Sequence, residues 1–276
     1  MKVSIFSTCV VDLMFPNVGI AMVEVLERLG CETELPEHQI CCGQPTYNSG
    51  LVKESMATIK NQIDAFAEAD YVVGLAGSCC GMFKEYPEMF AENDPYKQKA
   101  QELADKTWEF SQFIWRVLGV HDCGATFDGE KATYHRSCHM TRILGERETP
   151  FWLLDNVKGL EMAPLPASHL EYCCGFGGTF SVKSPEISGM MVAEKSSDLF
   201  DTGAEILVSC DMGCLMNIAG KLNRDGKKMK IMHLAEVLNH NVDLSRVERP
   251  DFAAIEAAHL KAAPVNMPWH KAYVEN

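Results

Sequence analysis

The feature that most constrains this chain is a pair of adjacent cysteines followed by glycine, which occurs twice. The two copies are Cys41-Cys42-Gly43 and Cys173-Cys174-Gly175. Each pair has one further cysteine upstream and one downstream, which gives the sets Cys9, Cys41, Cys42, Cys79 and Cys138, Cys173, Cys174, Cys214. Cys9 and Cys138 are 129 positions apart, Cys41 and Cys173 132, and Cys79 and Cys214 135. The second set therefore repeats the first with two three-residue insertions, which predicts a duplicated fold with two matched sulfur sites.

The repeat also predicts the domain organisation. A chain of 276 residues is long enough for two domains of ordinary size. We expect a first cysteine-rich domain over residues 1–125, a second over residues 130–245, and a C-terminal arm over residues 246–276. In the arm, Pro250, Pro264 and Pro268 flank a short predicted helix at residues 252–261, and we expect this arm to pack on the body or on a partner.

Apolar patterns predict strands that alternate with helices. The predicted strands are 2–8, 71–76, 131–137, 160–165, 206–209 and 228–232, the predicted helices are 18–29, 51–67, 108–118, 184–200 and 233–238, and residues 32–40 are expected to be extended. This alternation is typical of an α/β fold with a small parallel sheet flanked by helices in each half. Ligands in such folds bind at the carboxyl ends of the strands. Because each repeated cysteine follows a predicted strand, we expect the eight sulfurs to converge there.

Composition excludes several classes of protein. The net charge of −13 and the pI near 5.1 argue against a nucleic-acid partner, because phosphate binding needs a basic face. No apolar run has the length of a membrane span, and the N-terminus enters a predicted strand directly, without the apolar core of a signal peptide. We therefore expect a cytoplasmic protein without a membrane span.

Thiolate ligation is the chemistry that these cysteines suggest. In a reducing compartment twelve cysteines do not form a disulfide framework, and adjacent cysteines such as Cys41 and Cys42 would pair only under strain. Four thiolates are the common ligand set of an iron–sulfur cluster, so the two sets predict two clusters, of the 4Fe-4S type. Zinc is the alternative, although its usual C-x-x-C knuckles are missing because positions 82 and 217 are Met and Asn. Buried structural cysteine, the third interpretation, predicts scattered positions and not matched sets.

Four cysteines lie outside the repeat. Cys80 and Cys210 adjoin predicted ligands and are candidates for an extra metal ligand or a redox-active thiol. Core packing is the expected role of Cys31 and Cys123.

Histidines and lysines near the second set are weaker candidates. His135 and His139 flank Cys138 and could orient a ligand or donate to a cluster sulfur, or be ordinary buried histidines. Lys183 and Lys195 could neutralise an anionic cluster or substrate, or be solvated. His169 and His233 carry less signal, and no histidine has a recognisable partner that would make it a general base, so the catalytic residues are not predicted.

Several longer motifs resemble one family. They are Cys41-Cys42-Gly43-Gln44-Pro45, Gly77-Ser78-Cys79, the run from Cys173-Cys174-Gly175 to Lys183, Cys214-Leu215-Met216-Asn217-Ile218, and Met232-His233-Leu234-Ala235-Glu236-Val237. The chain resembles the CCG-domain (cysteine-rich domain) iron–sulfur proteins over about residues 1–240. That family includes the cysteine-rich subunit of heterodisulfide reductase and the iron–sulfur subunit of glycolate oxidase.

The resemblance implies an electron-transfer subunit. Its family role would be to carry electrons, as part of an oxidoreductase, in a complex with other subunits that oxidises L-lactate or a similar 2-hydroxy acid to pyruvate. Substrate would then be handled by the complex. Heterodisulfide reductase continues each set to a final C-x-x-C, whereas this chain has Met82 and Asn217, so four-ligand clusters that relay electrons are the better expectation. The alternatives are a thiol–disulfide reductase subunit and a zinc-stabilised interaction module.

Overall fold

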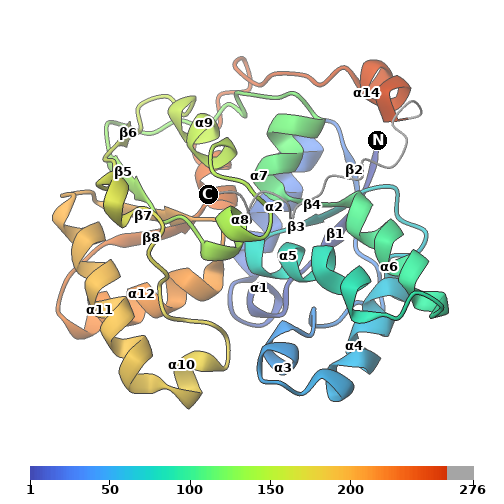
Figure 1. Ribbon diagram of the computed structural model, residues 1–276. Helices are drawn as coiled ribbons and strands as arrows, with labels where there is room; N and C mark the ends of the chain where they lie inside the picture. The colour runs from blue at the N-terminus through green and yellow to red at the C-terminus, as the bar shows by residue number, and fades with distance from the viewer. Residues whose placement is uncertain (260–276) are drawn as a thin grey trace.

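A computed structural model describes residues 1–259 of the chain, with the side chains of residues 167 and 259 excepted (Figure 1). Within these residues the strands form two four-stranded parallel sheets. The first has the order β2-β1-β3-β4 and the second the order β6-β5-β7-β8. The strands are β1 Lys2–Phe6, β2 Glu32–Glu34, β3 Val72–Gly74, β4 Thr107–Glu109, β5 Lys131–Tyr134, β6 Glu161–Met162, β7 Ile206–Ser209 and β8 Lys230–His233. The identical order confirms the predicted duplicated α/β fold.

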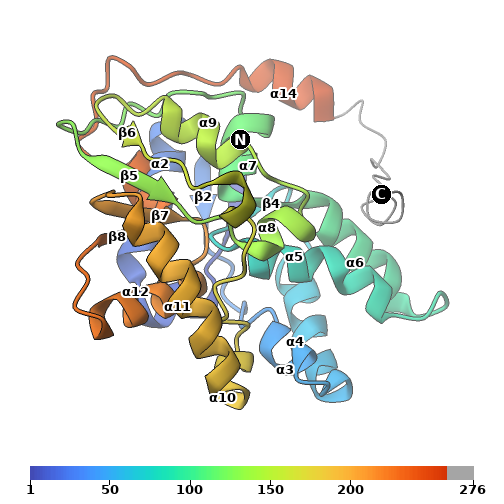
Figure 2. The ribbon, with the colours of Figure 1, turned by 60° about the vertical axis from the view of Figure 1, so that its left-hand side comes forward.

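Helices cover the faces of both sheets (Figures 1 and 2). The first half contains α1 Cys9–Met14, α2 Pro16–Arg28, α3 Gln44–Asn48, α4 Val52–Ala65, α5 Gly77–Glu85, the 3-10 helix η1 Tyr86–Met89, α6 Pro95–Lys106, α7 Phe110–Gln112 and the π-helical turn η2 Phe113–Val117. The second contains α8 Cys138–Arg142, α9 Thr149–Asp155, η3 Ala167–His169, α10 Phe180–Lys183, α11 Pro185–Asp201, α12 Met212–Arg224 and α13 Leu234–Leu238, and α14 Phe252–His259 follows.

Buried apolar residues explain these elements. Every residue of β3 and β7 is buried, as expected for central strands of a parallel sheet covered on both faces. In α2 the buried residues recur at helical spacing and face the first sheet. That helix ends at Arg28, and Gly30 turns the chain after it with a φ of +92°, the left-handed conformation that glycine adopts at little cost.

The predicted helix at residues 108–118 is wrong in its first part. Thr107–Glu109 is strand β4, which pairs in parallel with β3, and helix begins only at Phe110. Because β4 has only three residues, the apolar period of the following helical turns dominated the pattern. The strand predicted at residues 206–209 is β7 with the same bounds, and the one predicted at residues 228–232 is β8, shifted to residues 230–233. Several others are shorter than predicted: residues 2–8 contain β1, residues 160–165 contain β6, and the extended residues 32–40 contain β2.

One hydrophobic core extends through both halves. The larger buried cluster contains Val25 and Val73 from the first half and Leu207 and Leu215 from the second. Arg28 of α2 reinforces this contact, because its guanidinium donates to the carbonyl of Leu238 at 2.8 Å. The two halves therefore fold as one packed body, while the predicted boundaries at residues 1–125 and 130–245 stay a prediction.

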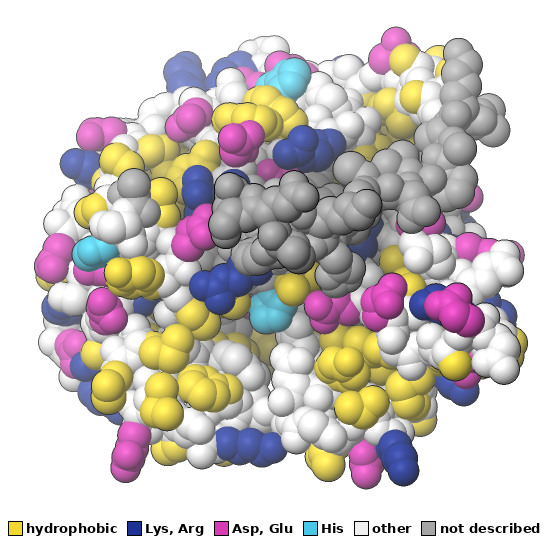
Figure 3. Space-filling model, in the orientation of Figure 1, with side chains coloured by type: hydrophobic (Ala, Val, Ile, Leu, Met, Phe, Trp, Pro, Cys, Tyr) yellow, Lys and Arg dark blue, Asp and Glu magenta, His cyan; other side chains and the backbone are white. Residues whose placement is uncertain are grey.

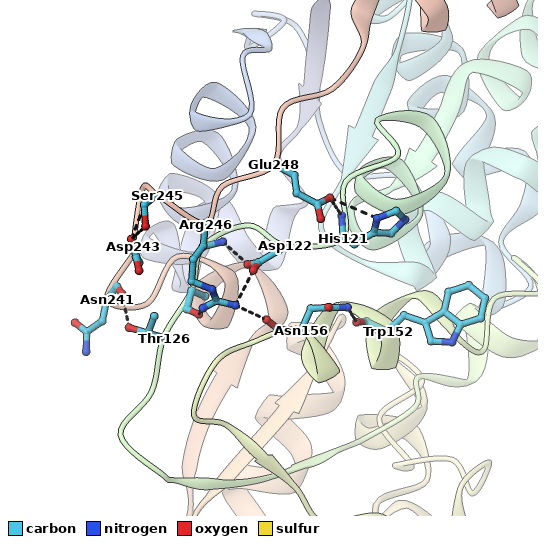
Figure 4. A network of polar contacts seen from close by, with 12 residues as sticks. His121, Asp122, Thr126, Trp152, Asn156, Asn241, Asp243, Ser245, Arg246 and Glu248 are labelled. Carbon is cyan, nitrogen blue, oxygen red and sulfur yellow. Dashed lines mark hydrogen bonds and ion pairs between the residues drawn. The ribbon is translucent and has the colours of Figure 1, made fainter.

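The segment after α13 binds back onto the connection between the halves (Figure 4). The Arg246 guanidinium lies 2.6 Å from a carboxylate oxygen of Asp122, and a Glu248 oxygen accepts from the backbone N–H of His121 at 2.7 Å. Further along, the side chains of Phe252 and Ile255 pack against the core. Helix α14 lies within the helix predicted at residues 252–261, and the rest of the predicted arm, residues 260–276, lies outside the described residues. Among residues 1–259, none of the helices has the length and apolar character needed to traverse a bilayer.

Candidate metal centre

All eight repeated cysteines line one cavity between the two halves of the molecule. Further residues of the wall include Gln44 and Pro45 at the start of α3 in the first half, and His139, Phe176 and Asp211 in the second. The two sets are thus brought together at the carboxyl ends of the sheets.

Helix N-termini carry four of these cysteines. Cys9 and Cys138 are the first residues of α1 and α8, while Cys79 and Cys214 are the third residues of α5 and α12. Free backbone N–H groups and the positive end of the helix dipole favour negative charge at such positions. Hydrogen bonds to Cys41 and to Cys173, together with burial, nevertheless raise the pKa of Cys9 and of Cys138, so both are thiols when no metal is bound.

A left-handed glycine turns the chain directly after each cysteine pair. Gly43 has a φ of +81° and Gly175 a φ of +79°. Gly175 also has no room for a side chain, because a Cβ there would lie 2.8 Å from the carbonyl oxygen of Ser188, whereas the nearest neighbour of a Cβ at Gly43 would be 3.5 Å away. The turn lets both cysteines of a pair face the same cavity.

Within each set the thiols contact one another in a chain. The Sγ atoms of Cys9 and Cys41 are 3.7 Å apart, and all twelve cysteines of the sequence are free thiols in the described residues. Hydrogen bonds from Cys42 and Cys9 lower the pKa of Cys41, and those from Cys138 and Cys174 lower the pKa of Cys173. The same shared protons raise the pKa of Cys42 and of Cys174, with burial adding to the shift. The first cysteine of each pair is therefore the preferred thiolate.

Hydrogen bonds across the cavity fix the two sets relative to each other. Ser78, directly before Cys79, donates its hydroxyl to Asp211 at 2.6 Å. The Gln44 amide nitrogen lies 3.2 Å from the Nε2 atom of His139 and donates to the Ser78 carbonyl at 3.1 Å. Near the rim, the hydroxyls of Ser49 and Thr179 are 2.8 Å apart.

The donor set matches thiolate-bound metal. Each half offers four sulfurs linked by contacts from one to the next, and in the second half a ring nitrogen of His135 lies within 4.8 Å of the Cys174 and Cys214 sulfurs. Both ring nitrogens of His135 are buried with no hydrogen-bond partner among the described residues, and burial lowers the pKa of this histidine to about 3. A neutral imidazole thus faces the second set.

Cys80 and Cys210 are fully buried and lie outside the lining of the cavity. The Cys80 thiol points to the carbonyl of Trp108 at 3.6 Å, and Cys210 accepts from the Tyr134 hydroxyl at 3.3 Å. Cys31 and Cys123 are part of the hydrophobic core.

The remaining candidates lie at different depths. His139 is in the cavity wall, 3.5 Å from the Cys138 sulfur. Lys195 is buried and donates to the carbonyl of His169 at 2.5 Å, while Lys183 is exposed at the end of α10. His233 is buried at the end of β8, where one ring nitrogen lies 3.0 Å from the Leu75 carbonyl of the other half.

Sequence reasoning missed two acidic residues. Asp211 adjoins Cys210, and it caps α12 by accepting from the Gly213 N–H at 3.0 Å. Glu109 ends β4 and caps α7, and burial raises its pKa to about 7 despite bonds from Ser111 and Gln112. Asp211 could have been found as an N-cap residue before Met212. Glu109 was hidden inside the wrongly predicted helix.

Comparison with known proteins agrees with this geometry. The family described as "Cysteine-rich domain" (CCG) matches residues 3–84 and 132–219. The chain is 55% identical to Lactate utilization protein A of Geobacillus thermodenitrificans (strain NG80-2) and 56% identical to that of Bacillus subtilis (strain 168), over 87% of this chain and 99% of each relative. A hypothetical protein from Helicobacter pylori shares the fold, with a TM-score of 0.56 at 12% identity over 92% of this chain and 50% of its own. The chain therefore belongs to the CCG cysteine-rich domain family and is a homologue of Lactate utilization protein A.

Proposed function

We propose that this protein is the iron–sulfur electron-transfer subunit of a cytoplasmic complex that oxidises L-lactate, or a similar 2-hydroxy acid, to pyruvate. The observation that carries the proposal is the convergence of two matched sets of four cysteines on one cavity. The name of the relatives supports lactate as the substrate class.

Cys9, Cys41, Cys42 and Cys79 would hold one four-iron cluster, and Cys138, Cys173, Cys174 and Cys214 the other. When bound, such clusters accept and donate electrons. The protein's own contribution is to supply four of the sulfur ligands from helix N-termini and to hold the two sets at a fixed separation through the Ser78–Asp211 hydrogen bond. That bond joins two regular elements, because Ser78 lies in the first turn of α5 and Asp211 caps α12.

Oxidation of the 2-hydroxy acid is assigned to another subunit. In the wall of the cavity, Asp211 accepts from Ser78 and from the Gly213 N–H, and His139 contacts Gln44 and Cys138. These two groups, which could otherwise abstract a proton, are therefore already engaged in holding the loops together. An electron relay fits this arrangement better than a substrate site with a free general base.

Exposed apolar side chains suit docking to partner subunits. Leu13 and Met14 on α1 are 79% and 58% exposed, and Val182 on α10 is 80% exposed. Each of them lies within ten residues of a repeated cysteine in the sequence. Figure 3 shows hydrophobic side chains on the lower surface of both halves. Contact there would bring a partner's carrier close to the cavity.

Metal analysis tests the proposal. Anaerobically purified protein should contain about eight iron and about eight sulfide per chain, as two four-iron clusters require, and its visible absorption should bleach with dithionite. About two zinc per chain with no visible absorption would overturn the electron-transfer function in favour of a structural module.

One observation favours a second candidate, a mixed protein with zinc in the second half only. His135, Cys174 and Cys214 offer a nitrogen and two sulfurs within 4.8 Å of one another, a set that zinc accepts. About four iron and about one zinc per chain would support that candidate.

The thiol–disulfide reductase alternative predicts that Cys80→Ala or Cys210→Ala abolishes activity of the assembled complex with iron content unchanged, and retained activity would exclude it.

A further inference from the structure

The residue three positions before the first cysteine of each set differs between the halves. Phe6 precedes Cys9, and His135 precedes Cys138. The Phe6 ring is buried and stacks on Phe83 with a centroid distance of 4.5 Å. Phe6 belongs to the same buried cluster as Cys42, so the first set lies near an apolar ring at the position where the second set has an imidazole.

His135 is poised toward the second set of sulfurs. Its side chain is 0% exposed, and neither ring nitrogen has a hydrogen-bond partner among the described residues. Leaving a buried polar group unsatisfied is costly, so an unpaired imidazole indicates a partner that binds in the functional state. A ring nitrogen and the sulfurs of Cys174 and Cys214 all lie within 4.8 Å of one another, which places such a partner at the second set.

The sheet fixes the backbone of His135. Its N–H donates to the carbonyl of Val208 at 2.8 Å, and its own carbonyl accepts from the Ser209 hydroxyl at 3.0 Å. Both partners belong to β7, which also leads into the loop before Cys214. The ring is therefore positioned by the fold before any metal binds.

A buried lysine adds to the difference between the halves. Lys195 in α11 follows Ile63 in α4 by 132 positions, the interval that also separates the cysteine pairs. The same interval relates two observed contacts, since Gly43 adjoins Ile59 and Gly175 adjoins Met191. Lys195 thus places a buried ammonium, 5.6 Å from the ring centroid of Tyr172 next to Cys173, at the position where the first half has an isoleucine.

We propose that His135 donates its ring N–H to a sulfur of the cluster held by Cys138, Cys173, Cys174 and Cys214, and that the second centre consequently has the higher reduction potential. The inference rests on the proposed function. Four thiolates already complete the usual ligand set, so the imidazole is assigned a hydrogen bond and not a bond to iron. A hydrogen bond to sulfur and a nearby cation both stabilise the more negative reduced state. Electrons released by oxidation of the 2-hydroxy acid would collect at the second centre.

The experiment measures each centre separately. Cys42→Ser should leave only the second centre, and Cys174→Ser only the first. Each variant is then combined with His135→Phe, which places at this position the residue type that the first half has at Phe6. EPR-monitored redox titration should show that His135→Phe lowers the potential in the Cys42→Ser background by about 59 mV or more, the shift for a tenfold change in a one-electron ratio. In the Cys174→Ser background it should change nothing. His135→Gln, which keeps an N–H donor, should recover part of the shift.

The converse variant uses intact cysteines. Phe6→His should raise the potential of the first centre and bring the two titration steps closer together. Failure of either His135→Phe or Phe6→His to move a potential in cluster-loaded protein would overturn the inference, and so would equal shifts in both backgrounds. A strong nitrogen coupling in pulsed EPR of the wild type would overturn the hydrogen bond by showing direct ligation. Absence of iron from the wild type would instead reject the proposed function.

Discussion

The two halves hold their cysteines in the same way and surround them differently. In each half a helix begins at the first cysteine, a left-handed glycine follows the pair, and the last cysteine lies in the first turn of a longer helix. Around this frame the first half places Phe6 and Ile63, and the second half His135 and Lys195. Ligand geometry has thus been kept in both copies, whereas the residues behind the ligands differ. This is how a duplicated fold could acquire two centres with different properties.

Replacing one cysteine of a Cys-Cys pair should have the largest effect, because it should remove the metal centre of one half and leave that of the other. We expect Cys42→Ser and Cys174→Ser each to lower the iron content from about eight to about four per chain, because a four-iron cluster needs its thiolates. Iron and sulfide analysis of anaerobic protein, with circular dichroism as the control for folding, measures this. Loss of all iron in either variant would contradict two separate centres.

The next largest difference between the halves should come from replacing the glycine that follows each cysteine pair. A Cβ at Gly175 would meet the Ser188 carbonyl oxygen at 2.8 Å, whereas at Gly43 it would meet only a Thr58 methyl at 3.5 Å. Gly43→Ala should cost about 1–2 kcal/mol through its left-handed backbone alone. Gly175→Ala should cost about 2–4 kcal/mol, because the steric conflict adds to that strain. Urea unfolding of the two variants measures the loss of unfolding free energy in each. Equal losses would show that the backbone near Ser188 moves aside without cost.

Features of the fold and the site that depend on a local sequence pattern could be predicted, whereas those that depend on packing between distant residues could not. The cysteine sets and the strands β1, β3, β5 and β7 follow from local patterns, and the fully buried β3 and β7 are the clearest because such strands read as apolar runs. The meeting of both sets at one cavity depends on packing between halves, for example Ser78 with Asp211, which no local pattern encodes. The role of Glu109 was missed because a three-residue strand is too short to show a period.

Glu109 and His233 occupy matching places at the ends of β4 and β8, and each caps the helix that follows with a capping box. Glu109 is fully buried, its pKa is raised to about 7 by burial, and the groups facing it are Glu146, Cys80, Cys210 and Tyr134. Between its ordinary pKa of 4.5 and about 7 the folded protein holds a proton that the unfolded chain releases. The free energy of unfolding should therefore fall as pH rises through this window.

Glu109→Gln should remove that dependence, since an amide oxygen can still cap α7 without bearing a charge. The variant should exceed the wild type in stability by about 2–3 kcal/mol above pH 7, with little difference below pH 4.5. Thermal unfolding from pH 4 to pH 8 tests this, and His233→Gln serves as the comparison from the other half. A wild-type advantage at pH 8 would mean that Glu109 is ionised and paired in the folded protein.

The smallest expected difference concerns the carbonyl of the second cysteine in each pair. In the first half the Tyr86 hydroxyl donates to the Cys42 carbonyl at 2.7 Å, and in the second the Asn217 amide donates to the Cys174 carbonyl at 2.8 Å. Asn217 is the third residue after Cys214, and its hydrogen bond holds the carbonyl of the cysteine loop from helix α12. Met82, which is the third residue after Cys79, is buried in the core, and in the first half Tyr86 makes the hydrogen bond to the loop carbonyl.

Tyr86 is fully buried, whereas Asn217 is partly exposed, and water can replace only the second hydrogen bond. Tyr86→Phe should therefore cost about 1–2 kcal/mol in unfolding free energy, and Asn217→Ala about 0.5 kcal/mol. Urea titration of metal-free protein measures both, and the rate of iron loss in air shows whether each loop protects its own centre. If Asn217→Ala proves the costlier variant, the second loop depends on its single hydrogen bond more than burial suggests. The two cysteine loops would then differ in stability as well as in surroundings.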